Sequence, residues 1–323
     1  MSNNHPGKMT PKAQITIGIV NWNTKDYLDQ LLDSIYESVH DLEYDIIVVD
    51  NGSTDGSVQM LKSKHPRVKL IENETNRGFA APCNQIIGRL RTEYILLVNT
   101  DVVVFPGCID TLYNFMVEKK EAAACGPKLF SKDGKIQPTA RRFHGIGTIL
   151  AETMLPSKPI IFLMRLFNPW NSLREAEYVS AAFIMMRKKA IDHIGPFDDN
   201  FVLYVQEIDW CYRAAKAGWK TYYVPKAQAI HYEGVSMRPI AEEAFGRLVK
   251  ERYHFILKHF GRAKASSLAR LLPYAIRFKL LMLKFALWFD HSYRHKEYVL
   301  KKMYRMWRGS RNIADNSCDG MLS

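Results

Sequence analysis

The chain has 323 residues, of which 47% are hydrophobic and 12% aromatic, so it can bury the core of one large domain or of one domain with an appendage. Its five cysteines are odd in number and widely spaced, with no Cys-x-x-Cys pair, which argues against a cysteine zinc site and favours reduced thiols in the cytosol. Nearly all of the net charge of +12 lies in residues 236–323, which hold 18 Lys and Arg against 7 Asp and Glu, but no recognition module accompanies this charge, so we expect no nucleic-acid partner.

Residues 13–104 follow a polar tail over residues 1–12 and alternate between two periodicities. Apolar residues at helical spacing predict helices over residues 27–36, 58–64 and 80–89. Short apolar runs predict four strands, at residues 15–20, 45–49, 68–71 and 94–98. The first of these runs lacks a cleavage site, so we expect no secretory signal. Strands that alternate with helices predict an α/β fold with a Rossmann-like, mostly parallel, right-handed sheet flanked by helices.

The pattern is looser after residue 106. Residues 128–137 are typical of a hairpin, and the loop over residues 141–171 is long and rich in Pro, Gly and aromatic residues, so we expect it to order around a ligand. Regular elements return as a strand at 178–186, helices at 188–194 and 208–217, and a strand at 220–224. We therefore predict one globular domain over residues 13–235 and a basic, amphipathic helical extension over residues 236–323.

Polar side chains follow three of the predicted strands. Residues 50–53, 76–79 and 99–101 come after the second, third and fourth strands. Because the carboxyl ends of parallel strands meet at one edge of a sheet, where ligands bind, we expect the three segments to line a cleft. Asp50 would accept hydrogen bonds there from a base or a ribose. An Asx turn with a Ser or Asp helix cap accounts equally well for this segment without any ligand.

One carboxylate and one imidazole offer a site for a metal ion. Asp101 follows the apolar residues 95–98, so we expect its side chain to face the cleft. Together with His231 it is suited to hold a divalent cation that bridges a diphosphate. A purely structural, hydrogen-bonded role is the alternative for His231.

Short motifs occur in a fixed order over residues 14–235. They are VNWN at 20–23, VDNGSTD at 49–55, NRGF at 76–79 with Asn84, VNTD at 98–101, IGPFD at 194–198, QEIDWCYR at 206–213, AGW at 217–219, and the segment from Val224 to His231. None is specific alone. The ordered set resembles the family 2 glycosyltransferases with the GT-A fold, particularly the branch that includes bacterial rhamnosyltransferases.

This resemblance implies a site for a nucleotide-sugar donor and a divalent cation, Mg²⁺ or Mn²⁺. It places at the nucleotide the residues Val20, Asn21, Asp50, Asn51, Ser53, Asn76, Arg77, Gly78, Asn99 and Asp101. Asp101 stands at the last acid of the family's Asp-x-Asp motif and His231 at the family's histidine near the diphosphate, so both are implied metal ligands. Asn99 replaces the first acid of that motif, which argues against tight metal binding by two carboxylates.

The resemblance also implies the catalytic base of an inverting displacement. The family usually has Glu-Asp-x-Asp where this chain has Gln206-Glu207-Ile208-Asp209. Glu207 therefore falls on the acid that deprotonates the acceptor hydroxyl, and Asp209 is the second choice. Alternatively, both acids cap the helix that follows, because negative charge is favourable at a helix N-terminus.

The C-terminal extension interleaves apolar and aromatic residues with Arg and Lys over residues 255–289. No uncharged run reaches the roughly 18–20 residues of a membrane-spanning helix. A basic amphipathic helix of this kind suits an anionic membrane surface. Packing on the domain or on a second subunit is the alternative.

The sequence thus predicts a metal-dependent, inverting glycosyltransferase of bacterial surface polysaccharide synthesis, cytoplasmic and peripheral on the inner face of the cell membrane. We expect a dTDP- or UDP-sugar donor and a glycan or lipid-linked acceptor, and only the family branch favours a rhamnosyl donor. The alternative is a catalytically impaired GT-A domain that acts as a binding or scaffold component of a glycan-assembly complex, because residues 99 and 206 depart from the family pattern. A nucleotidyltransferase is disfavoured, since no Gly-rich, basic loop follows the first strand.

Overall fold

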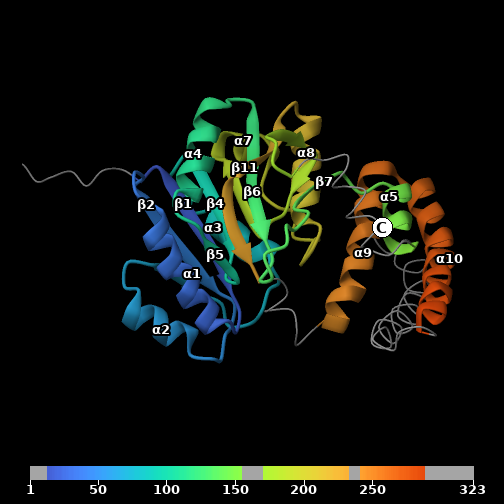
Figure 1. Ribbon diagram of the computed structural model, residues 1–323, viewed down its shortest axis with the longest axis horizontal. Helices are drawn as coiled ribbons and strands as arrows, with labels where there is room; N and C mark the ends of the chain where they lie inside the picture. Colours follow the sequence, from blue (N-terminus) through green and yellow to red (C-terminus); the bar gives the residue numbers. More distant parts are fainter. Residues whose placement is uncertain (1–12, 155–169, 233–240, 288–323) are drawn as a thin grey trace, which may run out of the picture.

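The computed structural model describes residues 13–154, 170–232 and 241–287. Within these ranges the chain forms a three-layer α/β/α domain with a group of helices beside it (Figure 1). The predicted polar tail, part of the predicted 141–171 loop and the end of the predicted extension lie outside the described residues.

The first half of the domain is a parallel α/β unit. Its elements are β1 (Ile15–Asn21), α1 (Lys25–Ser38), β2 (Tyr44–Asp50), α2 (Ser57–Lys64), β3 (Lys69–Glu72), α3 (Ala80–Ile87) and β4 (Tyr94–Asn99). β1 pairs in parallel with β2 on one side and with β4 on the other, and β2 pairs in parallel with β3. The elements predicted for residues 13–104 are confirmed, with ends shifted by one or two residues.

The second half extends the sheet with strands of both directions. Its elements are β5 (Val102–Val104), α4 (Cys108–Glu118), β6 (Ala122–Phe130), β7 (Ala140–Arg141), α5 (Ile146–Met154), β8 (Arg174–Ala176), β9 (Tyr178–Val179), β10 (Phe183–Arg187), α7 (Lys188–Ile194), α8 (Gln206–Lys216) and β11 (Lys220–His231). In the described residues the strand order is β3-β2-β1-β4-β10-β6-β11-β5, with β8 beside β11. β10, β5 and β8 run antiparallel to their neighbours, so the sheet is mixed, although most of its paired residues lie in parallel ladders.

Several elements of this half differ from the sequence prediction. α4 and β6 occupy the region with the loose pattern, and α5 lies in the predicted loop. β6 is rich in Ala, which has low strand propensity, and it is a strand because it is buried along almost its whole length. The predicted strand over 178–186 is interrupted at residues 180–182, and β11 continues past residue 224 through an irregularity in its register.

Helices cover both faces of the sheet. In β2, Ile46 and Val48 belong to the same buried cluster as residues of α1, α2 and α4, whereas Ile47 and Val49 belong to the cluster that includes residues of α3, α7 and α8. All four side chains are at most 5% exposed. A strand that is buried on both faces reads as a continuous apolar run, which explains why residues 46–49 show no alternation.

The C-terminal helices α9 (Ala241–Phe260) and α10 (Arg262–Leu287) pack with α5 beside α8 (Figure 1). Phe255 and Ile256 of α9 and Leu272 of α10 belong to the same buried cluster as α8 and the neighbouring face of the sheet. Of the alternatives for the extension, packing on the domain is therefore seen for its first part. Among the described helices, none combines the length and the apolar character needed to cross a membrane.

A tight contact joins the loop before α3 to the segment before α8. Gly78 has a φ of +78°, and a Cβ on it would lie 2.3 Å from Val202 Cγ1 and 2.8 Å from the Val202 carbonyl oxygen. The next residue, Phe79, donates its backbone N–H to that same oxygen at 2.7 Å. Only glycine satisfies both the backbone conformation and the space available here.

We predict that Gly78→Ala destabilises the protein by about 1–3 kcal/mol more than Gly134→Ala, because the new Cβ displaces Val202. Gly134 is the matched control: its φ is +74°, but a Cβ on it would meet nothing within 4 Å. That variant reports the cost of a left-handed backbone alone, about 1–2 kcal/mol. Denaturant unfolding measures both, and equal losses would contradict the steric contact.

Candidate active site

A cavity of about 440 Å³ opens at the carboxyl ends of β1 and β4. This is the point in the sheet where the strand order reverses, and α/β folds bind ligands there. Eight of the predicted site residues line it: Val20, Asn51, Asn76, Gly78, Asn99, Asp101, Glu207 and His231. The structure therefore brings together residues that are more than two hundred positions apart in the sequence.

Asp50, Asn21 and Ser53 support the cavity wall from behind. The buried Asp50 accepts hydrogen bonds from Asn21 Nδ2 at 2.7 Å and from the Ser53 backbone N–H at 2.9 Å. Ser53 Oγ also accepts hydrogen bonds, from Asn21 Nδ2 at 3.1 Å and from the Asn23 backbone N–H at 2.9 Å. None of the three lines the cavity, and the contacts seen at Asp50 are those of the turn.

Asn51 ties the end of β2 to the loop that follows β3. Its Nδ2 donates to Asn76 Oδ1 at 2.9 Å and to the Gly78 carbonyl at 2.8 Å, while its Oδ1 accepts from the Arg77 backbone N–H at 3.1 Å. These bonds fix residues 76–78 at the cavity. Arg77 is exposed and does not line the cavity.

The pairing of β5 with β11 brings Asp101 and His231 together. Asp101 immediately precedes β5, and His231 stands opposite Val102 in the antiparallel ladder. His231 Nε2 lies 3.3 Å from Asp101 Oδ1. Gln137 holds the histidine from the other side, because its Nε2 donates to the His231 carbonyl at 2.9 Å and its Oε1 lies 3.0 Å from His231 Nδ1. An amide oxygen only accepts, so Nδ1 carries the hydrogen and Nε2 faces the carboxylate.

This donor pair fits a divalent cation. A carboxylate oxygen and an imidazole lone pair that face each other repel unless a proton or a cation lies at them. Neighbouring ligands of an octahedral ion with bonds of about 2.1 Å are about 3.0 Å apart, close to the observed spacing. Asn99 lines the same cavity with an amide in place of a second carboxylate.

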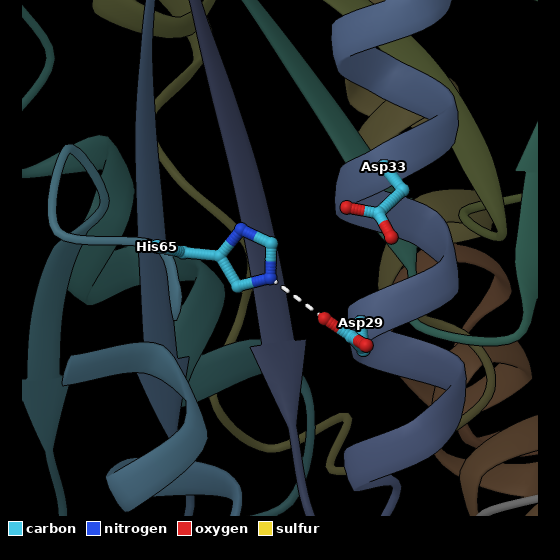
Figure 2. A group of neighbouring side chains, drawn as sticks. All are labelled: Asp29, Asp33 and His65. Atoms are coloured by element: carbon cyan, nitrogen blue, oxygen red, sulfur yellow. Dashed lines mark hydrogen bonds and ion pairs between the residues drawn. The ribbon is translucent and has the colours of Figure 1, made fainter. Parts of the chain in front are cut away.

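A second group of acidic and histidine side chains lies between α1 and the end of α2, outside the cavity lining. Potential ligand atoms of Asp29, Asp33 and His65 lie within 4.8 Å of one another (Figure 2). Lys64 Nζ binds Asp29 at 2.8 Å and Asp33 at 2.9 Å, and His65 Nε2 lies 2.8 Å from Asp29. Burial acts to raise the pKa of Asp29, but its hydrogen bonds with Lys64 and His65 lower it. An ammonium group already supplies positive charge here, so this group is an ion-pair network.

Glu207 is the second residue of α8 and lines the cavity. It is 9% exposed, and its Oε2 has no hydrogen-bond partner in the described part of the chain. Burial raises the pKa of Glu207 to about 8, although hydrogen bonds from its own backbone N–H and from that of Ala181 act to lower it. A general base works best when its pKa is near the operating pH, so this carboxyl is suited to that role.

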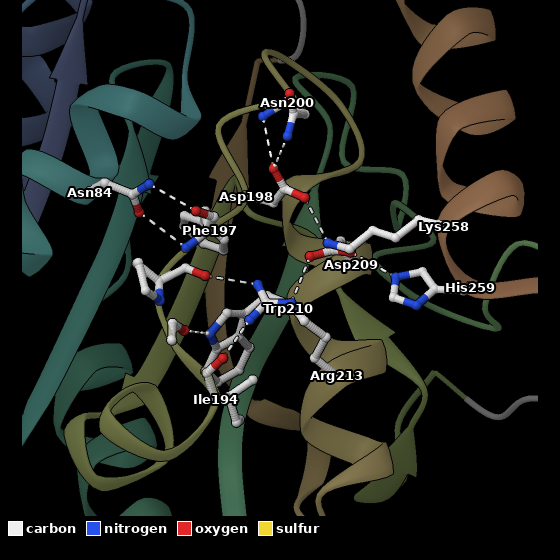
Figure 3. A network of polar contacts seen from close by, with 12 residues as sticks. Asn84, Ile194, Phe197, Asp198, Asn200, Asp209, Trp210, Arg213, Lys258 and His259 are labelled. Carbon is white, nitrogen blue, oxygen red and sulfur yellow. Dashed lines mark hydrogen bonds and ion pairs between the residues drawn. The ribbon is translucent and has the colours of Figure 1, made fainter. Parts of the chain in front are cut away.

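Asp209 faces away from the cavity and toward α9 (Figure 3). Its Oδ2 accepts a hydrogen bond from Arg213 Nε at 2.8 Å, and its Oδ1 lies 2.7 Å from both Lys258 Nζ and His259 Nε2. Burial alone would raise the pKa of Asp209, but its partners His259, Lys258 and Arg213 hold it at about 2. Both oxygens are occupied, so Asp209 anchors α9 and is not available as a base in this structure.

Sequence reasoning did not select several residues at this site. These are Trp22, Phe79, Thr100, Ser180, Ala181, Ala182, Leu203, Tyr204 and Gln206 in the cavity lining, and Gln137 behind His231. Most are apolar or small, and such residues give the same pattern in a core as in a binding site. For four of them, the available signal was their place inside family motifs: Trp22, Phe79, Thr100 and Gln206.

Known proteins resemble this chain in sequence and in fold. The family model described as glycosyl transferase family 2 matches residues 16–195, more than half of the chain. An N-acetylglucosaminyl-diphospho-decaprenol L-rhamnosyltransferase of Mycobacterium tuberculosis H37Rv is 28% identical over 207 residues, which cover 59% of this chain and 67% of the relative. The rhamnosyltransferase WbbL of Escherichia coli K12 is 23% identical over 256 residues, which cover 76% and 93%.

The fold also resembles that of a solved glycosyltransferase. The mannosyltransferase PcManGT from Pyrobaculum calidifontis, solved in complex with GDP-Man and Mn²⁺, matches with a TM-score of 0.59 at 15% identity, over 95% of this chain and 90% of that one. At this identity the likeness is one of fold. The chain therefore belongs to glycosyl transferase family 2, in its rhamnosyltransferase-like branch, and has the GT-A fold.

Proposed function

We propose that the protein is an inverting glycosyltransferase that moves a sugar from a nucleotide-sugar donor to an acceptor hydroxyl in the synthesis of a bacterial surface polysaccharide. The observation that carries this proposal is the carboxyl of Glu207. It is buried in the same cavity as Asp101 and His231, and one of its oxygens has no partner among the described residues. A buried polar atom without a partner costs stability, and a substrate hydroxyl that binds there accounts for that cost.

In this reaction Glu207 accepts the proton of the acceptor hydroxyl. The hydroxyl oxygen bonds to the anomeric carbon of the donor sugar, and the bond from that carbon to the diphosphate breaks. The nucleoside diphosphate leaves with the bonding electrons, and attack from the opposite side inverts the anomeric configuration. The backbone N–H groups of Glu207 and Ala181 hold the carboxylate in place throughout.

The donor side of the cavity consists of the segments that follow β1, β3 and β4. Asp101 and His231 would hold Mg²⁺ or Mn²⁺, which when bound supplies positive charge against the diphosphate. Asn51 and its hydrogen bonds keep residues 76–78 in position beside the donor. We infer a dTDP- or UDP-sugar donor, and we favour a rhamnosyl donor because both relatives named above are rhamnosyltransferases.

The acceptor is a glycan or a lipid-linked sugar, by analogy with the decaprenol diphosphate in the name of the Mycobacterium relative. The surface of α10 supports a lipid-linked acceptor, because one stretch of this helix exposes apolar and basic side chains together. The exposed residues are Leu271, Tyr274, Phe278, Leu281 and Met282, with Arg270, Arg277 and Lys284 among them. We infer that this face lies on the anionic inner surface of the cell membrane, where each Lys or Arg contributes about 1 kcal/mol.

We predict that Glu207→Gln lowers the rate of sugar transfer by about 10²- to 10⁴-fold, because the amide cannot accept the proton. Affinity for the nucleoside diphosphate is expected to stay unchanged. In the wild type, the rate should rise with pH up to about 8, where the carboxyl becomes ionised. Release of nucleoside diphosphate from a panel of donors and acceptors measures this. An active, folded Glu207→Gln protein would rule out Glu207 as the base, and a wild type that binds donor without turnover supports the scaffold alternative.

Glu207→Gln is expected to become increasingly more stable than the wild type as pH rises. The pKa of Glu207 is about 8 in the folded protein against an ordinary value of 4.5, so the folded state holds this proton more tightly than the unfolded chain. Between these two pH values, the wild type loses up to about 1.4 kcal/mol of stability per pH unit from this group, and Glu207→Gln does not. Denaturant unfolding at pH 5 and pH 8 should show the gap between the two proteins widening. A constant gap would contradict the raised pKa.

For the cation, we predict that Gln137→Ala weakens Mn²⁺ binding about 10- to 100-fold, because it frees the imidazole that faces Asp101. His231→Ala should weaken it at least as much. His65→Ala is the matched control, since His65 lies in the ion-pair network that Lys64 already neutralises. Calorimetric titration of Mn²⁺ in the presence of UDP or dTDP compares the three. If only His65→Ala loses affinity, the cation binds at Asp29, Asp33 and His65 and not at Asp101 and His231.

For the membrane, we predict that the full-length protein floats with anionic liposomes at low salt and that Tyr274→Glu with Leu281→Glu abolishes flotation. Both side chains are 66% exposed on α10, so the double substitution removes apolar area and adds negative charge without disturbing the core. Leu173→Glu is the control, because Leu173 is 52% exposed outside α10. Wild type that stays with the soluble fraction contradicts membrane contact.

A further inference from the structure

Glu251 on α9 is a buried carboxylate that has no part in the chemistry described above. It is 6% exposed and accepts hydrogen bonds from three successive backbone N–H groups. Val202 and Leu203 donate to Oε1 at 3.0 and 3.1 Å, and Tyr204 donates to Oε2 at 2.9 Å. Burial raises the pKa of Glu251, and these hydrogen bonds act against that rise. Because one carboxylate accepts from three consecutive N–H groups, it fixes the backbone of this segment in one position.

The segment that Glu251 holds forms one wall of the cavity. Residues 201–205 are in neither a helix nor a strand, so their N–H groups have no ladder partners and need another acceptor. Leu203 and Tyr204 line the cavity, and α8 with Glu207 begins immediately after them. The position of residues 202–204 therefore sets where the carboxyl of Glu207 lies.

Lys258, also on α9, binds residues on either side of the segment that Glu251 holds. It lies seven residues after Glu251, which is two turns of helix, so both side chains project from one face of α9. Its Nζ donates to Asp198 Oδ2 at 2.7 Å and to Asp209 Oδ1 at 2.7 Å (Figure 3). α9 thus fixes residues 198–209 at their beginning, middle and end.

We propose that Glu251 is a positioning residue for sugar transfer: it fixes residues 202–204 and thereby holds Glu207 at the correct reach from the acceptor hydroxyl. The kinetic part of this inference rests on the proposed function, whereas the contact between Glu251 and the loop does not. It makes the first helix of the C-terminal segment a component of the active site.

Glu251 also acts on Glu207 through its charge. The negative charge of Glu251 raises the pKa of Glu207, and the positive charge of Arg141 lowers it. Replacing Glu251 by a neutral residue therefore makes Glu207 lose its proton at lower pH. Because Glu251→Asp keeps this charge, a shift of the pH profile in Glu251→Gln alone reports the charge, whereas a shift in both variants reports a change in the burial of Glu207.

The test compares two variants of Glu251 with one control in the full-length protein. Glu251→Gln removes the charge, and Glu251→Asp keeps the charge but shortens the side chain. Glu152→Gln is the control, because Glu152 binds Arg252, the neighbour of Glu251 on α9, at 2.7 Å, whereas the hydrogen bonds to the backbone of residues 202–204 come from Glu251. We expect faster amide hydrogen exchange over residues 201–206 in both Glu251 variants and unchanged exchange in Glu152→Gln. Wild-type exchange in Glu251→Gln would overturn the contact.

Kinetics with donor and acceptor then test the positioning role. We expect kcat to fall about 10- to 100-fold in both Glu251 variants, as for a misplaced catalytic group, with little change in the KM of the donor. The acid limb of the pH profile should move to lower pH in Glu251→Gln only, and Glu152→Gln should behave as wild type. Faster exchange with wild-type kcat and an unmoved limb would overturn the proposal. If the wild type transfers no sugar, the proposed function fails, and the exchange comparison still decides whether Glu251 holds the loop.

Discussion

The cavity depends on backbone groups that no strand satisfies and that buried polar side chains hydrogen-bond instead. At the carboxyl edge of the sheet the ladders end, and each N–H or C=O in the loops beyond needs another partner. Asn51 binds the backbone of Arg77 and Gly78, Gln137 binds the carbonyl of His231, and Glu251 binds three consecutive N–H groups. These loops are therefore held at fixed points although they contain no regular structure.

Acids that are close in sequence serve opposite purposes because a helix points them in different directions. Residues two apart on a helix do not face the same way, so Glu207 lies at the cavity while Asp209 lies against α9. Asp209 has cationic partners and a pKa of about 2, whereas Glu207 is desolvated and has a pKa of about 8. The chain thus places an ion-pair anchor next to the proposed base. The anchor contributes stability, whereas a buried carboxyl oxygen without a partner among the described residues costs stability.

The parallel half of the fold could be predicted because its strands are continuous apolar runs and its helices are strongly periodic. The mixed half could not be predicted. The Ala-rich sequence of β6 has a low propensity for strand, and no local pattern marks the break between β9 and β10 at residues 180–182. The same limit applies to the site. Family motifs selected Asp101, Glu207 and His231, but the pairing of β5 with β11 is what brings the first and last together. No local pattern marks Gln137 or Glu251, whose roles arise from contacts with segments far away in the sequence.

The packing of α9 into the main core has a consequence for how the protein matures. A ribosome releases the strands and α8 first, and chains generally fold from the N-terminus as they emerge. Until Phe255 and Ile256 arrive, the core cluster that they share with α8 stays open to water, and residues 202–204 lack their acceptor. A nascent chain at that stage exposes apolar surface that chaperones recognise, and Glu251 does not yet lie near Glu207. The negative charge of Glu251, which helps to raise the pKa of Glu207, is thus added only when α9 has docked.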